Sequence, residues 1–125
     1  MKKRFIEIST FTELVQTLGP NWDENYADLQ NLLMEDPEHG KVIPGCGGLR
    51  KVRLADPKRG KGKRGGARVL YLHVSEADWI FLIDVYDKND KEDLSAQEKK
   101  VLRALTEQLR DEAFAAVKEL EEDYQ

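Results

Sequence analysis

Cysteine and long apolar runs are scarce in this sequence, and each scarcity excludes a class of protein. Cys46 is the single cysteine in 125 residues. An intramolecular disulfide framework is therefore excluded, and a reducing compartment is indicated, so we expect a cytoplasmic protein. No apolar run approaches the ~20 residues that a membrane-spanning helix needs. The basic N-terminus is followed by neither an apolar stretch nor a small-residue cleavage site, so it is not interpreted as a secretory signal.

Soft metal ligands are equally scarce. The only histidines and cysteine are His39, His73 and Cys46, and no two of them have the sequence separation that is typical of metal ligands. We therefore expect no metal and no other cofactor. His73 falls in an expected strand and is interpreted as a sheet residue. Cys46 stands between glycines and could be an exposed thiol, but the sequence shows no base that would activate it.

Acidic residues are almost missing from one segment of an otherwise acidic chain. The chain has 20 Lys and Arg against 24 Asp and Glu, a net charge of −4. From residue 50 to residue 68, nine basic residues face the single acid Asp56, so this segment carries +8 and the remainder carries −12. The nine are Arg50, Lys51, Arg53, Lys58, Arg59, Lys61, Lys63, Arg64 and Arg68. A local field this strong favours a polyanion, and a nucleic-acid backbone fits best.

Hydrophobic periodicity predicts seven elements in the chain. In order they are a strand at 5–8, helices at 10–18 and 22–35, strands at 49–54, 67–74 and 79–86, and a long helix at 96–122. Capping-box patterns, Thr10-x-x-Glu13 and Ser95-x-x-Glu98, are expected to begin the first and the last helix. Gly45, in the connection before the second strand, belongs to a group of three glycines that indicates a sharp bend.

These elements predict an α+β fold in a single domain spanning residues 1–125. Consecutive strands joined by short turns pair antiparallel. We therefore expect a small, mainly antiparallel, curved sheet of about four strands, with the two N-terminal helices and the C-terminal helix packed on one side. The strand at 79–86 is almost wholly apolar and is expected to be central and covered on both faces.

The loop between the second and third expected strands matches a nucleotide-binding sequence pattern but lacks the structural context that this pattern requires. Residues 60–65 read GKGKRG, which fits G-x-G-x-x-G, but a strand follows where the dinucleotide fold requires a helix. A P-loop is excluded because no Ser or Thr follows Lys61 or Lys63. Two interpretations remain open: a basic loop that closes over a phosphate chain, or a solvated hairpin tip. Period-2 alternation places Lys51 and Arg53 on one face of their strand, which continues the basic field.

Three motifs resemble the RelE/ParE toxin superfamily, and most closely the HigB-like branch of RelE toxins. They are GGLRKVR at 47–53, GKGKRGGARVLY at 60–71, and YDKND at 86–90 followed by LS at 94–95. The resemblance runs from Phe5 to Leu109. It implies a RelE-like fold and a cytoplasmic, metal-independent endoribonuclease, an mRNA interferase that enters the 30S A site of the ribosome and cuts mRNA. It also implies a cognate antitoxin partner, often a helix-turn-helix protein.

The resemblance assigns roles to particular residues. Its catalytic positions fall on Lys51, Arg53, Arg68 and Lys88, and Tyr86 is added to them as a candidate. The other basic residues of the segment are predicted, from their charge, to bind RNA and the ribosome: Arg50, Lys58, Arg59, Lys61, Lys63 and Arg64. A tyrosine that some relatives use falls near Leu94 and is absent here, so either Tyr86 replaces it or the cations act alone.

Two other functions compete with ribosome-dependent cleavage. The ParE-type relatives inhibit DNA gyrase on the same fold, but they generally lack this basic set. A non-catalytic RNA-binding module would instead be expected to show aromatic residues for base stacking on the strand face that carries Lys51 and Arg53.

Overall fold

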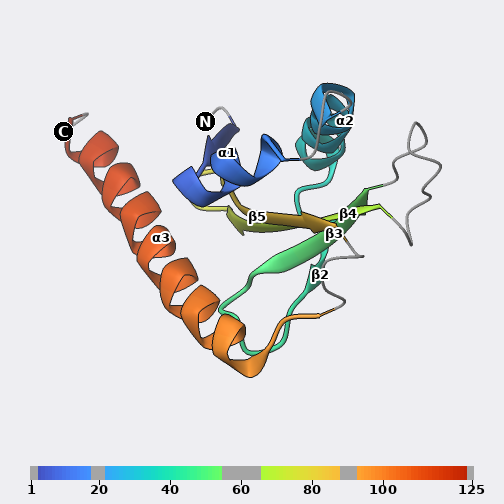
Figure 1. Ribbon diagram of the computed structural model, residues 1–125. Helices are drawn as coiled ribbons and strands as arrows, with labels where there is room; N and C mark the ends of the chain where they lie inside the picture. Colours follow the sequence, from blue (N-terminus) through green and yellow to red (C-terminus); the bar gives the residue numbers. More distant parts are fainter. Residues whose placement is uncertain (1–2, 18–21, 55–65, 88–92, 124–125) are drawn as a thin grey trace.

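The computed structural model describes residues 3–17, 22–54, 66–87 and 93–123, which form three helices and a five-stranded sheet (Figure 1). The elements are β1 (Arg4–Glu7), α1 (Ser9–Val15), α2 (Trp22–Glu35), β2 (Lys41–Val42), β3 (Arg50–Leu54), β4 (Ala67–Val74), β5 (Trp79–Asp87) and α3 (Ala96–Asp123). The strand order across the sheet is β1-β5-β4-β3-β2. The α+β class and the order of the predicted elements are confirmed.

The sheet is larger and more mixed than the sequence indicates. Strands β3, β4 and β5 form the expected antiparallel meander. β1, however, pairs parallel with β5, which aligns Arg4 with Trp79. The two-residue strand β2 adds a further edge, with Lys41 opposite Lys51. A two-residue strand is too short to show alternation, so the expected count of about four becomes five.

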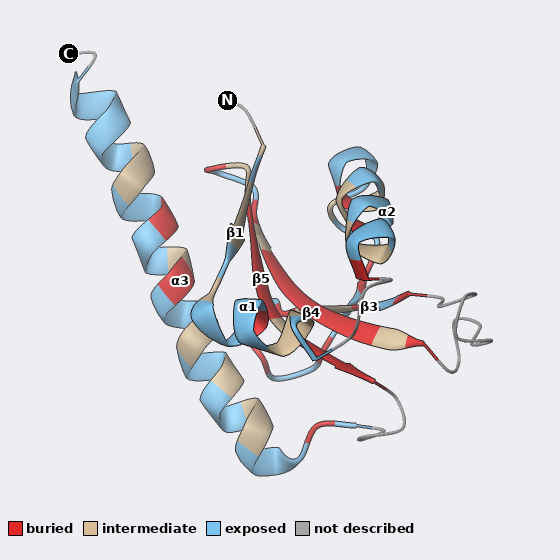
Figure 2. Cartoon of the chain, turned by 45° about the horizontal axis from the view of Figure 1, so that its top comes forward, coloured by how far each residue is buried: buried red, intermediate tan, exposed pale blue. Residues whose placement is uncertain are grey.

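Helices cover both faces of this sheet, so the expectation of one covered side was wrong. Phe11 and Leu29, from α1 and α2, pack with β-strand residues in one core cluster. Leu109 and Ala113, from α3, pack in another on the opposite face. Figure 2 shows the long stretches of buried residues in β4 and β5, between the N-terminal helices and α3. Strands that are apolar on both faces require cover on both.

Only one of the two expected capping boxes forms. At the start of α3 the Ser95 N–H donates to Glu98 Oε1 (3.0 Å), and the Glu98 N–H donates to Ser95 Oγ (3.1 Å). Thr10, by contrast, lies inside α1, which begins at Ser9, and its hydroxyl donates to the Ile83 carbonyl at 3.4 Å. The Thr10-x-x-Glu13 prediction was wrong because Thr10 contacts the sheet beneath the helix.

The connection before β3 fastens α3 to the sheet. The buried Thr106 hydroxyl is shared between the carbonyls of Cys46 (3.0 Å) and Arg103 (2.8 Å). Gly47, at a φ of +68°, lies so close that a Cβ would stand 2.7 Å from that hydroxyl oxygen. Cys46 is fully buried, and its thiol donates to the Lys99 carbonyl at 3.8 Å. The prediction of an exposed thiol was therefore wrong. The connection at Cys46 and Gly47 holds α3 against the sheet, and we call it the clasp.

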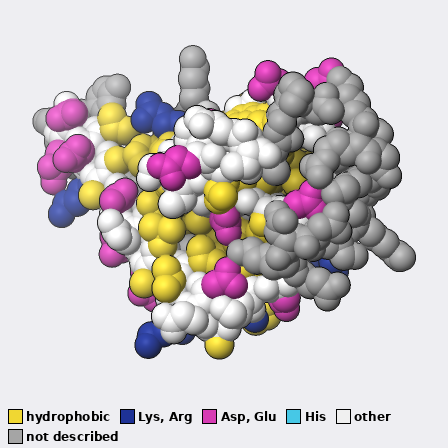
Figure 3. Space-filling view, viewed as in Figure 1, with side chains coloured by type: hydrophobic (Ala, Val, Ile, Leu, Met, Phe, Trp, Pro, Cys, Tyr) yellow, Lys and Arg dark blue, Asp and Glu magenta, His cyan; other side chains and the backbone are white. Residues whose placement is uncertain are grey.

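Charge is unevenly distributed along α3. Its first turns carry Lys99, Lys100 and Arg103, whereas its last turn carries Glu119, Glu121, Glu122 and Asp123. Figure 3 shows acidic side chains at the left of the view, where α3 ends. The basic end of α3 is the end that begins beside β2 and β3.

Candidate basic active site

The site begins with the alternation of side chains along β3. Val52 and Leu54 pack into the core beneath α1 and α2. Lys51 and Arg53 therefore point to the other face, since successive strand residues alternate. The register places Arg68 of β4 directly opposite Arg53, and Tyr86 of β5 opposite Arg68. Three adjacent strands thus bring four of the predicted catalytic residues onto one face.

Arg68 is the buried cation of this group. Its residue is 4% exposed, and its Nη1 donates to the Gly66 carbonyl at 3.0 Å. Burial lowers the pKa of Arg68, the nearby charge of Arg53 lowers it further, and Tyr86 and Asp87 act in the opposite sense. A guanidinium stays protonated under all ordinary conditions, so the chain keeps a positive charge where water is excluded. A buried cation of this kind is a candidate functional residue, and the catalytic role of Arg68 stays a prediction.

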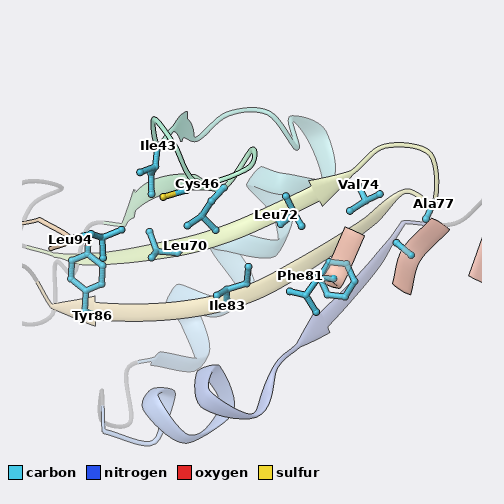
Figure 4. Packing of buried hydrophobic residues seen from close by; sticks show 13 residues of the cluster. Ile43, Cys46, Leu70, Leu72, Val74, Ala77, Phe81, Ile83, Tyr86 and Leu94 are labelled. Atoms are coloured by element: carbon cyan, nitrogen blue, oxygen red, sulfur yellow. The ribbon is translucent and has the colours of Figure 1, made fainter. Parts of the chain in front are cut away.

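Tyr86 places a phenol next to Arg68. Burial raises the pKa of Tyr86, and the carboxylates of Asp84 and Asp93 raise it further. The charge of Arg68 acts in the opposite sense on this pKa. The hydroxyl is protonated at neutral pH, and its role as a proton donor stays a prediction. Leu94 lies against the ring, at the left of Figure 4, and only 6% of Tyr86 and 7% of Leu94 are exposed.

Arg50 lies apart from this group. It precedes Lys51 on β3 and therefore points to the face beneath α2. Its Nη1 donates to the carbonyls of Glu38 (2.9 Å) and Gly40 (2.8 Å). The Gly40 N–H in turn donates to the buried Tyr71 hydroxyl at 2.8 Å. In this structure Arg50 fastens the turn before β2, and its predicted contact with RNA stays a prediction.

The remaining predicted site residues lie outside the described part of the chain. They are Lys58, Arg59, Lys61, Lys63, Arg64 and Lys88. Their roles, and the choice between a phosphate-binding loop and a solvated tip, stay predictions.

A pocket of about 570 Å³ adjoins the basic face. It lies between β2, β3 and the start of α3, and its described lining includes Lys41, Lys51, Arg53, Asp93 and Lys99. Sequence reasoning missed three of these, Lys41, Asp93 and Lys99. Nothing in the local pattern marked Lys41 as a strand residue, and Lys99 reaches the site only through the docking of α3.

Two further properties bear on the chemistry of the described residues. Within residues 3–17, 22–54, 66–87 and 93–123, no three His, Cys, Asp or Glu side chains gather as metal ligands. None of the helices over the same ranges is both long and apolar enough to span a membrane.

Comparison with known proteins identifies the family. The model of the RelE toxin of the RelE/RelB toxin–antitoxin system matches residues 34–124. The fold is similar to that of the isolated E. coli RelE toxin, at 17% identity and a TM-score of 0.53, over 83% of this chain and 99% of that one. A mutant E. coli RelE in the free state matches at 20% identity and a TM-score of 0.54, over 74% and 90%.

The third structure is the intact E. coli RelBE toxin–antitoxin complex, which matches at 20% identity and a TM-score of 0.52, over 67% of this chain and 94% of that one. At these identities the structural matches establish the shared fold. The family model covers most of the chain from the end of α2 to the end of α3. The chain therefore belongs to the RelE family of toxins from toxin–antitoxin systems.

Proposed function

We propose that this protein is a cytoplasmic, ribosome-dependent endoribonuclease that cuts mRNA in the 30S A site and is neutralised by a cognate antitoxin. Membership of the RelE family supports a toxin. The observation that carries the cleavage reaction is the grouping of Lys51, Arg53, Arg68 and Tyr86 on one sheet face. The HigB-like branch, and with it a helix-turn-helix antitoxin, belongs to the same proposal.

The face supplies what cleavage by a 2′-hydroxyl needs. When the 2′-oxygen attacks the adjacent phosphorus, negative charge develops on the phosphorane oxygens, and fixed cations stabilise it. Arg53 and Arg68 provide that charge opposite each other in the register. The proton of the 2′-hydroxyl passes to a base, and Tyr86 donates a proton to the departing 5′-oxygen. The products are a 2′,3′-cyclic phosphate and a 5′-hydroxyl, so no metal or other cofactor enters the balance.

Burial supplies a reason for dependence on the ribosome. Arg68 and Tyr86 are both less than a tenth exposed, and Leu94 lies on the Tyr86 ring. A free RNA cannot reach the phenol while Leu94 covers it. We propose that docking on the ribosome turns the Leu94 side chain away from the Tyr86 ring, while the start of α3 keeps its place, and presents the mRNA to the uncovered face.

The test is induced expression in bacteria followed by mapping of mRNA 5′ ends, with an Arg68→Ala variant as the matched control. New 5′ ends should appear within translated codons, require engaged ribosomes, and be absent with the variant. In a purified system, ribosome-bound mRNA should be cut well and naked RNA poorly. Equally vigorous cleavage of naked RNA at the same sites would overturn the ribosome dependence. Growth arrest with intact mRNA and inhibited gyrase would support the ParE-type alternative instead.

A further inference from the structure

The pocket beside the basic face is lined by two lysines that the proposed reaction does not use. We propose that Lys41 and Lys99 form a second phosphate-binding site, which holds the backbone of the same single-stranded RNA next to the phosphate that is cut. This inference rests on the proposed function for its RNA. We name Lys41 and Lys99 the flanking lysines.

Sheet pairing determines the position of Lys41. It stands directly opposite Lys51 in the antiparallel pair of β2 and β3. Directly opposed side chains on neighbouring strands have Cβ atoms about 5 Å apart, and like charges in such a pair are destabilising. Lys41 and Lys51 therefore repel each other across the β2–β3 pair. An anion bound between them would remove this repulsion.

Helix capping determines the position of Lys99. The reciprocal bonds of Ser95 and Glu98 define where α3 begins, and Lys99 follows in its first turn. The Cys46 thiol contacts the Lys99 carbonyl from the clasp before β3, and the nearly buried Leu94 anchors the entry to the helix. Lys99 is thereby brought to the pocket that Lys51 and Arg53 line, although it is far from both in sequence.

Positive charge is in excess among the described residues that line this pocket. Among the described lining residues, four cations meet one carboxylate, that of Asp93. Asp93 Oδ1 accepts the N–H of Leu94 at 2.8 Å and so serves the backbone before α3. Over the ranges that the structure describes, no carboxylate lies within ion-pairing distance of any of the four cations. By contrast Arg103, one turn further along α3, reaches Glu107 at 3.4 Å.

Continuity with the basic face favours RNA as the occupant. Lys51 and Arg53 line the pocket and also belong to the face that is proposed to hold the cut phosphate. An RNA backbone with one phosphate at Lys51 and Arg53 can therefore place a neighbouring phosphate at the flanking lysines. The volume of about 570 Å³ falls in the range of small-ligand sites and accommodates more than a bare phosphate.

The test compares two variants that each lose two lysines. The site variant combines Lys41→Ala with Lys99→Ala, and the control combines Lys100→Ala with Lys118→Ala, two exposed positions of α3 away from the pocket. The probe is a short 2′-O-methyl RNA, which resists cleavage, titrated by fluorescence anisotropy across a salt series. We expect the log–log salt slope of the site variant to flatten by about 1.4, since each phosphate contact on a single strand contributes about 0.7. The control should keep the slope of the parent.

Cleavage of ribosome-bound mRNA provides the second measurement. The site variant should cut slowly at low protein concentration and recover towards the parental rate at saturation, because the flanking lysines bind the RNA and do not touch the reacting atoms. A Lys99→Arg variant, which keeps the charge, should retain most of the parental slope.

The outcomes separate this inference from the proposed function. If the parent cleaves mRNA and the site variant matches the control in both measurements, the flanking lysines are not a phosphate site and the inference is wrong. If the parent cleaves nothing while the slope still depends on the flanking lysines, the phosphate site stands and the proposed reaction is wrong.

Discussion

The two faces of the sheet differ in what they bury. The face beneath α1 and α2 is apolar throughout its core, and its aromatic group of Phe11, Trp22 and Tyr26 packs edge to face with ring centroids 5.9–6.3 Å apart. The face beneath α3 has an apolar core that extends to Tyr86 and Leu94. The same face also carries Lys51 and Arg53, with Arg68 buried between neighbouring strands.

This difference separates stability from activity within a single sheet. β3 contributes to both, because Val52 packs into one core while Arg53 points to the basic face. Burial of apolar area stabilises the fold, whereas an uncompensated or buried cation costs free energy. We therefore expect substitutions on the α1/α2 face to change stability and substitutions on the basic face to change catalysis.

The largest effect is expected from Phe11→Ala. Phe11 is fully buried at the centre of the aromatic group, and truncating a buried phenylalanine costs about 3–5 kcal/mol. Phe114→Ala, at a position of α3 that is 41% exposed, is the matched control and should change the free energy of unfolding by less than about 1 kcal/mol. Urea denaturation followed by tryptophan fluorescence measures both. Equal losses in the two variants would contradict the assignment of the core.

Arg68→Ala should have the next largest effect. It should lower the rate of mRNA cleavage and leave the protein folded. Removing one group that stabilises transition-state charge typically costs about 10²–10³-fold in kcat. Arg68→Met fills the space that the side chain leaves and should lose activity equally, which separates charge from packing. Arg103→Ala removes an exposed arginine of α3 and should keep the parental rate. Single-turnover cleavage on ribosomes provides the measurement, and a folded Arg68→Met variant with the parental rate would refute the role.

Much of this division could be predicted from the sequence. Alternation along residues 49–54 placed Lys51 and Arg53 on a common face, and the apolar run at 79–86 indicated a strand covered on both sides. Both predictions depend on local periodicity. Successive side chains of a strand point to opposite faces of the sheet whatever the position of the strand in the fold.

The features that escaped prediction depend on long-range contacts. The parallel pairing of β1 with β5 joins residues about 75 positions apart, and no local pattern encodes it. Lys99 belongs to the pocket because Thr106 and Cys46 fasten α3 across the face. The Thr10-x-x-Glu13 pattern predicted a capping box that does not form, because the Thr10 hydroxyl donates instead to the Ile83 carbonyl of β5.

A smaller effect is expected from Thr106→Val, which tests how the α3 face is held together. Valine has nearly the shape of threonine but removes the 3.0 Å hydroxyl donor of the Cys46 carbonyl, which keeps only the bond from the Leu49 N–H at 3.3 Å. Losing one such hydrogen bond costs about 0.5–1.5 kcal/mol. Thr12→Val is the matched control, since Thr12 is exposed on α1 and bonds to Glu7 and Ile8. Its free energy of unfolding should change by less than about 0.5 kcal/mol. If both variants unfold at the same urea concentration as the parent, the clasp contributes nothing to stability.

The smallest effect is expected at Asp78, where the β4–β5 turn is joined to the start of β1. Lys3 Nζ donates to Asp78 Oδ1 at 2.8 Å, and His73 Nε2 lies 3.3 Å from the same oxygen. The hydrogen bond from Lys3 lowers the pKa of Asp78 most, burial opposes it, and His73 lowers it further. A carboxylate whose pKa is lowered by folding contributes stability above its unfolded pKa of about 3.9, and that stability is lost as the pH falls through the folded value.

Asp78→Asn isolates this charge, because asparagine tolerates the left-handed φ of +53° at this residue. At pH 7 the variant should be less stable than the parent by at most about 1 kcal/mol, since the side chain is partly solvated. The difference should begin to shrink as the pH falls below the unfolded pKa of about 3.9, where the unfolded chain takes up its proton first, and should go on shrinking towards the lower pKa of the folded carboxylate. Asp36→Asn, at an exposed position in a 3.6 Å pair with His39, controls for the change in net charge. Thermal melts from pH 7 to pH 3 measure the difference, and a gap that stays constant over this range would show that Asp78 stabilises the turn by geometry instead of charge.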